Sequence, residues 1–333
     1  MFDFLAETIK SDHVSVTSGK TETLSWSRPA PGVITFEPDA ATDKSVVISV
    51  GVHGNETAPI EIVSALVNHL IAGKRLLKVR LLVIIGNLEA MRQGQRYLTI
   101  DMNRLFSDHY LQHGSCYETQ RALQLQEIMQ HFYGAAQRHS HLHFDLHTAI
   151  RASQHLRFGL LPYLDKGQYD LHMIDWLQNI GLEAVVINHA PAATFSFFSS
   201  NQCDAASCTL ELGKASPFGY NDLQQFTGIK QGLVNLISGQ KNPSSSSSEL
   251  QLYKVAKVLT KSSEQFKLNL DEQVKNFTAF NKGFILYEDH KNQYPIQQET
   301  AYILFPNNHV KVGFRAGLLL QKAHLSEIIS PPE

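Results

Sequence analysis

The sequence of 333 residues has few cysteines and little net charge, and it lacks a long apolar run. Its three cysteines, Cys116, Cys203 and Cys208, are an odd number without CxxC spacing, so we expect no disulfide framework and a cytoplasmic location. Cys203 and Cys208 could pair or bind metal, but two small, semi-buried thiols are the favoured interpretation.

Charge and hydropathy exclude further classes of protein. The 29 basic and 31 acidic residues give a formal net charge of −2, which predicts neither nucleic acid nor an anionic membrane as a partner. The longest apolar stretch, around 81–85, is far shorter than the ~20 residues of a membrane span. The N-terminal segment carries Asp3 and Glu7 and no cationic start before an apolar block, so no signal peptide is expected. Nothing in the sequence indicates an oligomeric state.

What the sequence does contain is ordinary globular composition, with 43% hydrophobic and 18% charged residues, interrupted by one low-complexity segment. Residues 241–249 begin Lys-Asn-Pro and continue with five serines, which predicts an exposed linker. We therefore expect a catalytic domain over 1–240, a linker over 241–249 and a small domain over 250–333.

The two parts differ in their hydrophobic pattern. Before the linker, β-branched runs alternate with helical spacing, which predicts an α/β domain with a largely parallel or mixed sheet between helices. Strands are expected at 45–50, 79–85, 143–146, 184–187 and 208–212, and helices after an N-cap at Thr57, at 118–132 and at 221–237. After the linker, short β-type runs at 255–259, 266–270, 283–287, 301–305 and 317–320 predict a small, mostly-β C-terminal domain.

A candidate metal site follows the first of these strands. Gly51-Val-His-Gly-Asn-Glu56 places His53 and Glu56 just beyond a strand's carboxyl end, and its two glycines permit a tight turn. A His and a Glu three residues apart, with a distant His, form the His₂Glu set of catalytic zinc sites. Taken alone, this segment would more often be a capped turn without a metal.

The distant histidine is expected in His143-Phe-Asp-Leu-His147. His147 closes a strand-like run, whereas His139, His141 and His143 alternate and could simply line a polar face. Asp145 shares the strand face of His147 and could orient it as a hydrogen-bond acceptor, although a capping role is an equal alternative.

Four motifs in order resemble the zinc carboxypeptidase superfamily and, within it, the aspartoacylase and succinylglutamate desuccinylase branch. They are Gly51-x-His-Gly-Asn-Glu56, Asp101-x-Asn-Arg104, Asp145-Leu-His147 and Glu211 in Thr-Leu-Glu-Leu-Gly, and the resemblance covers roughly 45–240. It implies a zinc-carboxypeptidase-like fold with one Zn²⁺ per chain, bound by His53, Glu56 and His147. The implied reaction removes the acyl group from a small acidic N-acyl amino acid, with N-succinyl-glutamate of arginine catabolism as the leading case.

The acid–base residue is expected at Glu211. It ends an apolar strand, where burial should raise its pKa and suit a general base, although a strand-end salt bridge is the alternative. The resemblance implies that this glutamate takes a proton from the attacking water and delivers it to the leaving amine.

Arginines around residues 96–104 are candidates for binding carboxylates or a developing oxyanion, although a single arginine could also form a surface ion pair. The resemblance implies that Arg96 polarises the scissile carbonyl and that Asn103 and Arg104 bind the substrate's α-carboxylate, with Asp101 holding the loop. Arg151, and less clearly Arg157, could meet a further substrate carboxylate. A peptide-trimming carboxypeptidase and a non-catalytic metal-binding relative remain the competing functions.

Overall fold

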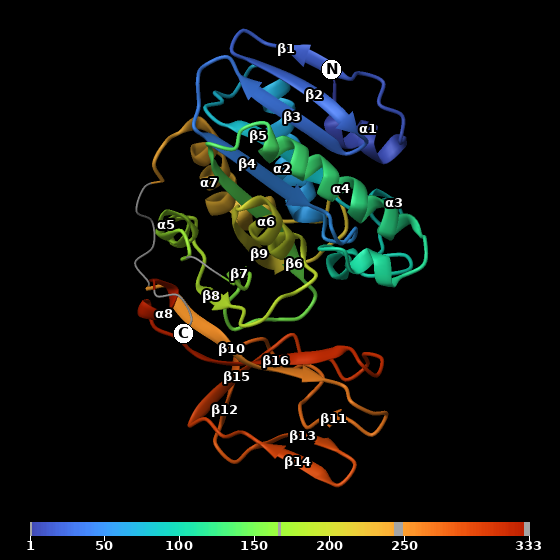
Figure 1. Cartoon of the computed structure of the whole chain (residues 1–333), viewed down its shortest axis with the longest axis vertical. Coiled ribbons are helices and arrows are strands. Elements are labelled where there is room, and N and C mark those ends of the chain that lie inside the picture. The colour runs from blue at the N-terminus through green and yellow to red at the C-terminus, as the bar shows by residue number, and fades with distance from the viewer. Residues whose placement is uncertain (1, 166–167, 243–248, 330–333) are drawn as a thin grey trace.

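A computed structural model describes residues 2–165, 168–242 and 249–329 and shows an α/β fold (Figure 1). Its strands are β1 (Ser18–Lys20), β2 (Leu24–Ala30), β3 (Val33–Pro38), β4 (Lys44–Val50), β5 (Arg80–Ile85), β6 (Ser140–Ala149), β7 (Phe158–Leu161), β8 (Ala184–Ile187), β9 (Ala206–Lys214), β10 (Gln251–Thr260), β11 (Lys267–Leu268), β12 (Thr278–Asn281), β13 (Ile285–Asp289), β14 (Asn292–Pro295), β15 (Thr300–Leu304) and β16 (Arg315–Lys322). A 13-stranded mixed sheet has the order β1-β2-β3-β5-β4-β6-β9-β7-β8-β10-β16-β15-β12, and β11-β13-β14 form a second sheet. The predicted mixed sheet is confirmed.

Helices cover both faces of the main sheet. They are α1 (Phe4–Lys10), α2 (Thr57–Ile71), α3 (Leu88–Arg92), α4 (Tyr117–Gly134), α5 (Leu171–Asn179), α6 (Phe195–Cys203), α7 (Thr227–Ser238) and α8 (Ser326–Ile329), with short 3₁₀ turns η1 (Met102–Arg104), η2 (His109–Gln112) and η3 (Leu223–Phe226). Val46, Ile48 and Val50 of β4 share one core with α2, α5 and α7, whereas Val47 packs in a second core with α4 and α6. Strand β4 is therefore buried on both faces, as expected for a strand between parallel neighbours.

The C-terminal part continues the main sheet. Strand β10 pairs in parallel with β8 and antiparallel with β16, so the segment after the linker is joined to the catalytic part by backbone hydrogen bonds. Its β-rich character is confirmed. One further hydrophobic core lies within it, and another is shared between its strands and β7 and β8. Most of the predicted linker, 243–248, lies outside the described residues. The domain boundaries at 240 and 250 stay a prediction.

Two local expectations differ from the structure. Thr57 is the first residue of α2 rather than its N-cap, because the cap position belongs to Glu56 and the Thr57 hydroxyl donates to the Ser216 carbonyl at 2.6 Å. The helix expected at 221–237 is divided into η3 and α7. Among the described residues, no helix has the length and apolarity needed to cross a membrane.

Candidate active site

The turn between β4 and α2 brings His53 and Glu56 to the carboxyl end of the parallel strands. Gly51 has a φ of +63°, a left-handed conformation that favours glycine. At Gly54 an added Cβ would lie 2.2 Å from the Met91 nitrogen, so this close approach between two chain segments requires glycine. The Gly54 amide also donates to the Arg96 carbonyl at 3.0 Å, which ties the turn to the loop that carries the predicted arginines.

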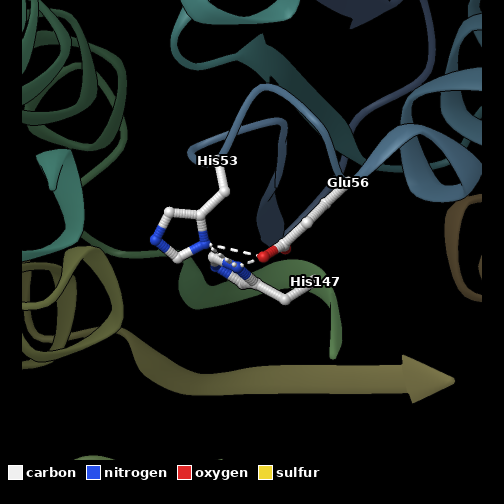
Figure 2. A group of neighbouring side chains, drawn as sticks. All are labelled: His53, Glu56 and His147. Carbon is white, nitrogen blue, oxygen red and sulfur yellow. Dashed lines mark hydrogen bonds and ion pairs between the residues drawn. The ribbon is translucent and has the colours of Figure 1, made fainter. Parts of the chain in front are cut away.

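The three predicted metal ligands converge (Figure 2). His53 Nδ1 lies 2.9 Å from Glu56 Oε1, His147 Nδ1 lies 2.9 Å from Glu56 Oε2, and the two Nδ1 atoms are 3.1 Å apart. Ligands bound tetrahedrally at zinc distances of 2.0–2.1 Å would be separated by about 3.3 Å, so this spacing fits a zinc ion. All three side chains are buried, and His53, Glu56 and His147 form the metal-binding candidate within the described part of the chain.

The other nitrogen of each histidine is held by a carboxylate. His53 Nε2 lies 2.9 Å from Asp101 Oδ1, and His147 Nε2 lies 2.9 Å from Asp145 Oδ2. This arrangement selects the tautomer that leaves Nδ1 free to bind a cation, as in many zinc sites. Burial raises the pKa of Glu56, but His53 and His147 outweigh it and hold that pKa below its usual range. The donor set therefore suits a divalent metal.

Glu211 lies on β9 directly beside His147 in the parallel register. Its Oε2 is buried and has no hydrogen-bond partner among the described residues. Burial and the nearby Glu56 carboxylate raise the pKa of Glu211 to about 7, although His147, Arg96 and His53 act in the opposite direction. A carboxyl group that titrates near neutrality and has a free oxygen is well suited to proton transfer.

Arg96 borders the metal ligands. Its NH1 donates to Glu56 Oε1 at 2.8 Å, and its side chain is 36% exposed, so the guanidinium lies between the cluster and solvent. Glu118 of α4 holds the loop that follows. Its side chain is buried, and its Oε1 accepts from the amides of Leu98 and Thr99 at 2.7 and 3.3 Å. The role of Glu118 could not be predicted from the sequence, because this residue occupies an ordinary first-turn position of a helix.

Asn103 and Arg104 lie in η1, on the same loop. Asp101 accepts from the Asn103 amide at 3.0 Å as well as contacting His53, which confirms that it holds this loop. The Asn103 side chain accepts from the Phe195 amide at 2.9 Å, and Arg104 NH1 donates to the Asn103 carbonyl at 2.6 Å. These contacts give both side chains a defined orientation.

Arg151 is placed differently from Arg96 and Arg104. Its NH1 donates to the carbonyls of Glu272 and Val274 at 2.7 and 2.8 Å, so it connects the end of β6 to the C-terminal part. It also lines a cavity of about 190 Å³ formed mainly by C-terminal residues. Arg157 donates to the Gln225 carbonyl at 2.6 Å. The substrate-binding role of Arg151 stays a prediction.

Arg315, at the start of β16, is a further cation that the sequence analysis missed. Burial and the charges of Arg104 and Arg96 lower its pKa to about 9, although Asp101 acts in the opposite direction. Among the described residues it has no ion pair, and its guanidinium carbon lies 5.9 Å from the Phe305 ring centre. No local signal in the β-type tail distinguishes this arginine, because only the folded chain brings it towards the Arg104 loop.

Comparison with known families gives two matches that together span most of the chain. A family model described as the succinylglutamate desuccinylase/aspartoacylase catalytic domain matches residues 42–237. A second, described as the AstE/AspA barrel-sandwich hybrid domain, matches residues 248–323.

Individual proteins are similar over nearly their full length. Succinylglutamate desuccinylase of Yersinia pestis (strain Pestoides F) is 45% identical over 328 residues, which are 98% of this chain and 99% of that protein. The crystal structure of succinylglutamate desuccinylase from Chromobacterium violaceum superposes with a TM-score of 0.84 at 39% identity, covering 97% of this chain and 98% of that one. The corresponding structure from Vibrio parahaemolyticus has a TM-score of 0.90 at 29% identity, covering 96% and 95%.

Proposed function

Because this chain belongs to the succinylglutamate desuccinylase/aspartoacylase family, we propose that it hydrolyses the amide bond of N-succinyl-L-glutamate to succinate and L-glutamate. The observation that carries this proposal is the buried carboxylate of Glu211 beside the converging His53, Glu56 and His147 ligands. A metal cluster next to an acid–base group is the arrangement needed to hydrolyse an amide, and it disfavours a purely metal-binding role.

One Zn²⁺ per chain would be held by Nδ1 of His53, Nδ1 of His147 and the Glu56 carboxylate. Three protein ligands leave one position open, which distinguishes a catalytic zinc site from a structural one. When bound, zinc supplies a Lewis acid that polarises the amide carbonyl and acidifies a water molecule.

Glu211 and Arg96 complete the chemistry. Glu211 in its ionised form accepts a proton from the attacking water and, once protonated, gives it to the departing amine of glutamate. Arg96 is positioned against Glu56, 2.8 Å away, and from there its always-charged guanidinium can stabilise negative charge that develops on the carbonyl oxygen.

The remaining cations favour an acidic substrate. Arg104 and Asn103 bind the α-carboxylate of the substrate. Both lie on the loop whose Asp101 contacts His53, and hydrogen bonds to backbone groups orient both side chains there. The charge of Arg315 adds to that of Arg96 and Arg104, and three partly buried guanidinium groups make anion binding favourable.

An amine-release assay with zinc-loaded protein tests this function. The panel is N-succinyl-glutamate, N-acetyl-glutamate, N-acetyl-aspartate and a peptide with a free carboxyl terminus. We expect the highest kcat/KM for N-succinyl-glutamate. Faster turnover of N-acetyl-aspartate would move the protein to aspartoacylase activity, and cleavage of the peptide alone would support a carboxypeptidase.

Replacing Arg151 with Ala tests whether this side chain binds the succinyl carboxylate of the substrate. A charge-assisted hydrogen bond contributes ~1.5–3 kcal/mol, so kcat/KM for N-succinyl-glutamate should fall roughly 10- to 150-fold. N-acetyl-glutamate lacks that carboxylate and should be affected much less. The measurement is the ratio of kcat/KM for the two substrates.

Arg157→Ala is the comparison variant, because Arg157 also follows β6, also donates to a backbone carbonyl and is the other candidate for this carboxylate. It should leave the ratio unchanged, and a change in the ratio in Arg157→Ala alone would assign the acyl carboxylate to Arg157 instead. Equal losses on both substrates in Arg151→Ala would show that Arg151 acts through the Glu272–Val274 backbone that it holds and does not bind the acyl group.

A further inference from the structure

A chain of buried polar side chains lies behind His147, on the face of the sheet that α6 covers. Ser49 on β4, His143 on β6 and Ser199 on α6 are each 0% exposed. Their surroundings are apolar: Val47 and Phe198 belong to the core on this face, and the Phe195 ring packs edge-on against His143 at 4.9 Å. We call these three residues the Ser–His–Ser chain. Polar groups are costly in such a core unless they are fully hydrogen-bonded.

A continuous series of hydrogen bonds connects the Ser–His–Ser chain to the predicted metal ligand His147. His147 Nε2 contacts Asp145 Oδ2 at 2.9 Å, and Ser49 donates to Asp145 Oδ1 at 2.5 Å. Ser49 Oγ then contacts His143 Nε2 at 2.8 Å, and His143 Nδ1 contacts Ser199 Oγ at 2.7 Å. The pairing of β4 with β6 places Ser49 directly opposite Asp145, so the sheet register itself aligns these groups.

The number of protons on each side chain determines which group donates in the hydrogen bonds between Asp145, Ser49 and His143. Ser49 donates its single hydroxyl proton to Asp145 Oδ1, so Ser49 Oγ must accept from His143 Nε2–H. Burial lowers the pKa of His143 to about 4, which keeps the ring neutral with one proton. Nδ1 of His143 is then an acceptor and faces the Ser199 hydroxyl at 2.7 Å, a hydroxyl that also lies 3.0 Å from the Ser196 carbonyl. At the other end, His147 Nε2 contacts Asp145, so Nδ1, which faces Glu56 and His53, is the nitrogen placed for a metal.

We propose that Ser49, His143 and Ser199 are positioning residues that orient Asp145 and thereby fix the ring and the tautomer of His147 for metal binding through Nδ1. The inference rests on the metal site of the proposed function. It extends that site beyond Asp145 by three residues, none of which is hydrogen-bonded to His53, Glu56 or His147 among the described contacts. Without it, the buried Asp145 carboxylate loses the donor to Oδ1 and can rotate, and the hold on His147 weakens.

Zinc affinity of the folded protein, measured by competition with a chelator, tests this role without reference to turnover. Ser49→Ala should weaken zinc binding about 10- to 100-fold, the usual effect of removing a partner behind a metal ligand. Ser45→Ala is the matched control. Ser45 lies on the same strand and is equally buried, but its hydroxyl contacts His139 at 3.2 Å and has no link to Asp145. The control should bind zinc as the native protein does.

A second pair of variants at His143 distinguishes orientation from packing. His143→Leu removes the donor to Ser49 and should weaken zinc binding, whereas the amide of His143→Gln can still donate and should restore part of the affinity. The visible spectrum of the Co²⁺-substituted protein should change in the weakened variants, because it reports ligand geometry independently of activity.

Native affinity and an unaltered cobalt spectrum in both Ser49→Ala and His143→Leu would overturn the inference. Should Ser49→Ala fail to fold, as circular dichroism would show, the His143 pair and Ser199→Ala decide the question by the same two measurements. Failure of the native protein to bind zinc would instead contradict the proposed function, so the two outcomes are distinguishable.

Discussion

Glu211→Gln should retain zinc and the native fold but lower kcat about 100- to 10,000-fold, the usual range for general acid–base catalysis. Glutamine has nearly the same shape as glutamate but cannot accept and return a proton. Activity should depend strongly on this position, because Glu211 Oε2 is buried with no hydrogen-bond partner in the described part of the chain and lies beside His147 on the adjacent strand. Steady-state kinetics on N-succinyl-glutamate, together with the zinc content of the same preparation, check the result.

The pH profile supplies an independent signature of Glu211. The base acts when it is ionised, so kcat/KM should fall as the pH drops through the pKa of this carboxyl group. Burial and Glu56 raise that pKa to about 7 in the metal-free protein, and a bound dication would lower it, so the acid limb is expected at or below about pH 7. This limb should be absent from the residual activity of Glu211→Gln.

Glu61→Gln is a suitable control for this substitution. Glu61 is a carboxylate of α2 whose oxygens contact the Gly219 amide and the Asn221 side chain, outside the metal cluster. Its replacement should leave kcat and the acid limb in place. Near-native kcat in Glu211→Gln would exclude Glu211 as the base.

Parts of the fold with a strong local signal could be predicted from the sequence. The run Ser-Val-Val-Ile-Ser-Val could be assigned to a strand because a strand between parallel neighbours is buried on both faces and hence continuously apolar. Strands β1 to β3 were not predicted. They form an antiparallel edge of the sheet. Strand β1 has three residues, none of them buried, and β2 contains a proline, so neither gives a strong strand pattern.

The metal ligands could be predicted for a similar reason. His53 and Glu56 lie within one turn after a strand, and His147 lies near the carboxyl end of β6, so the rule that sites form at the carboxyl ends of parallel strands brings them together. The surrounding groups depend on tertiary contacts that no local pattern encodes. Ser199 reaches His143 from a helix 56 positions away, and Arg151 contacts carbonyls more than 120 positions away.

His147→Ala should abolish both stoichiometric zinc binding and hydrolysis of N-succinyl-glutamate. The substitution removes one of the three protein ligands that a catalytic zinc site requires. It also removes the group between Asp145 and Glu56, each 2.9 Å from a nitrogen of the ring, so two buried carboxylates lose their shared partner. Zinc content after dialysis and the rate of amine release are the measurements.

His141→Ala is the matched control for the loss of a histidine from β6. His141 projects from the same strand, and its two ring nitrogens contact the backbone carbonyls of Cys203 and Ala136 at 3.0 and 3.1 Å, away from the cluster. Its replacement should leave one zinc per chain and most of the activity. Full-strength zinc binding by His147→Ala, combined with complete loss in a His143 variant, would move the ligand along the strand. We do not expect that outcome, because both ring nitrogens of His143 are hydrogen-bonded to serine hydroxyls. Nδ1 of His147, in contrast, faces the other two ligands.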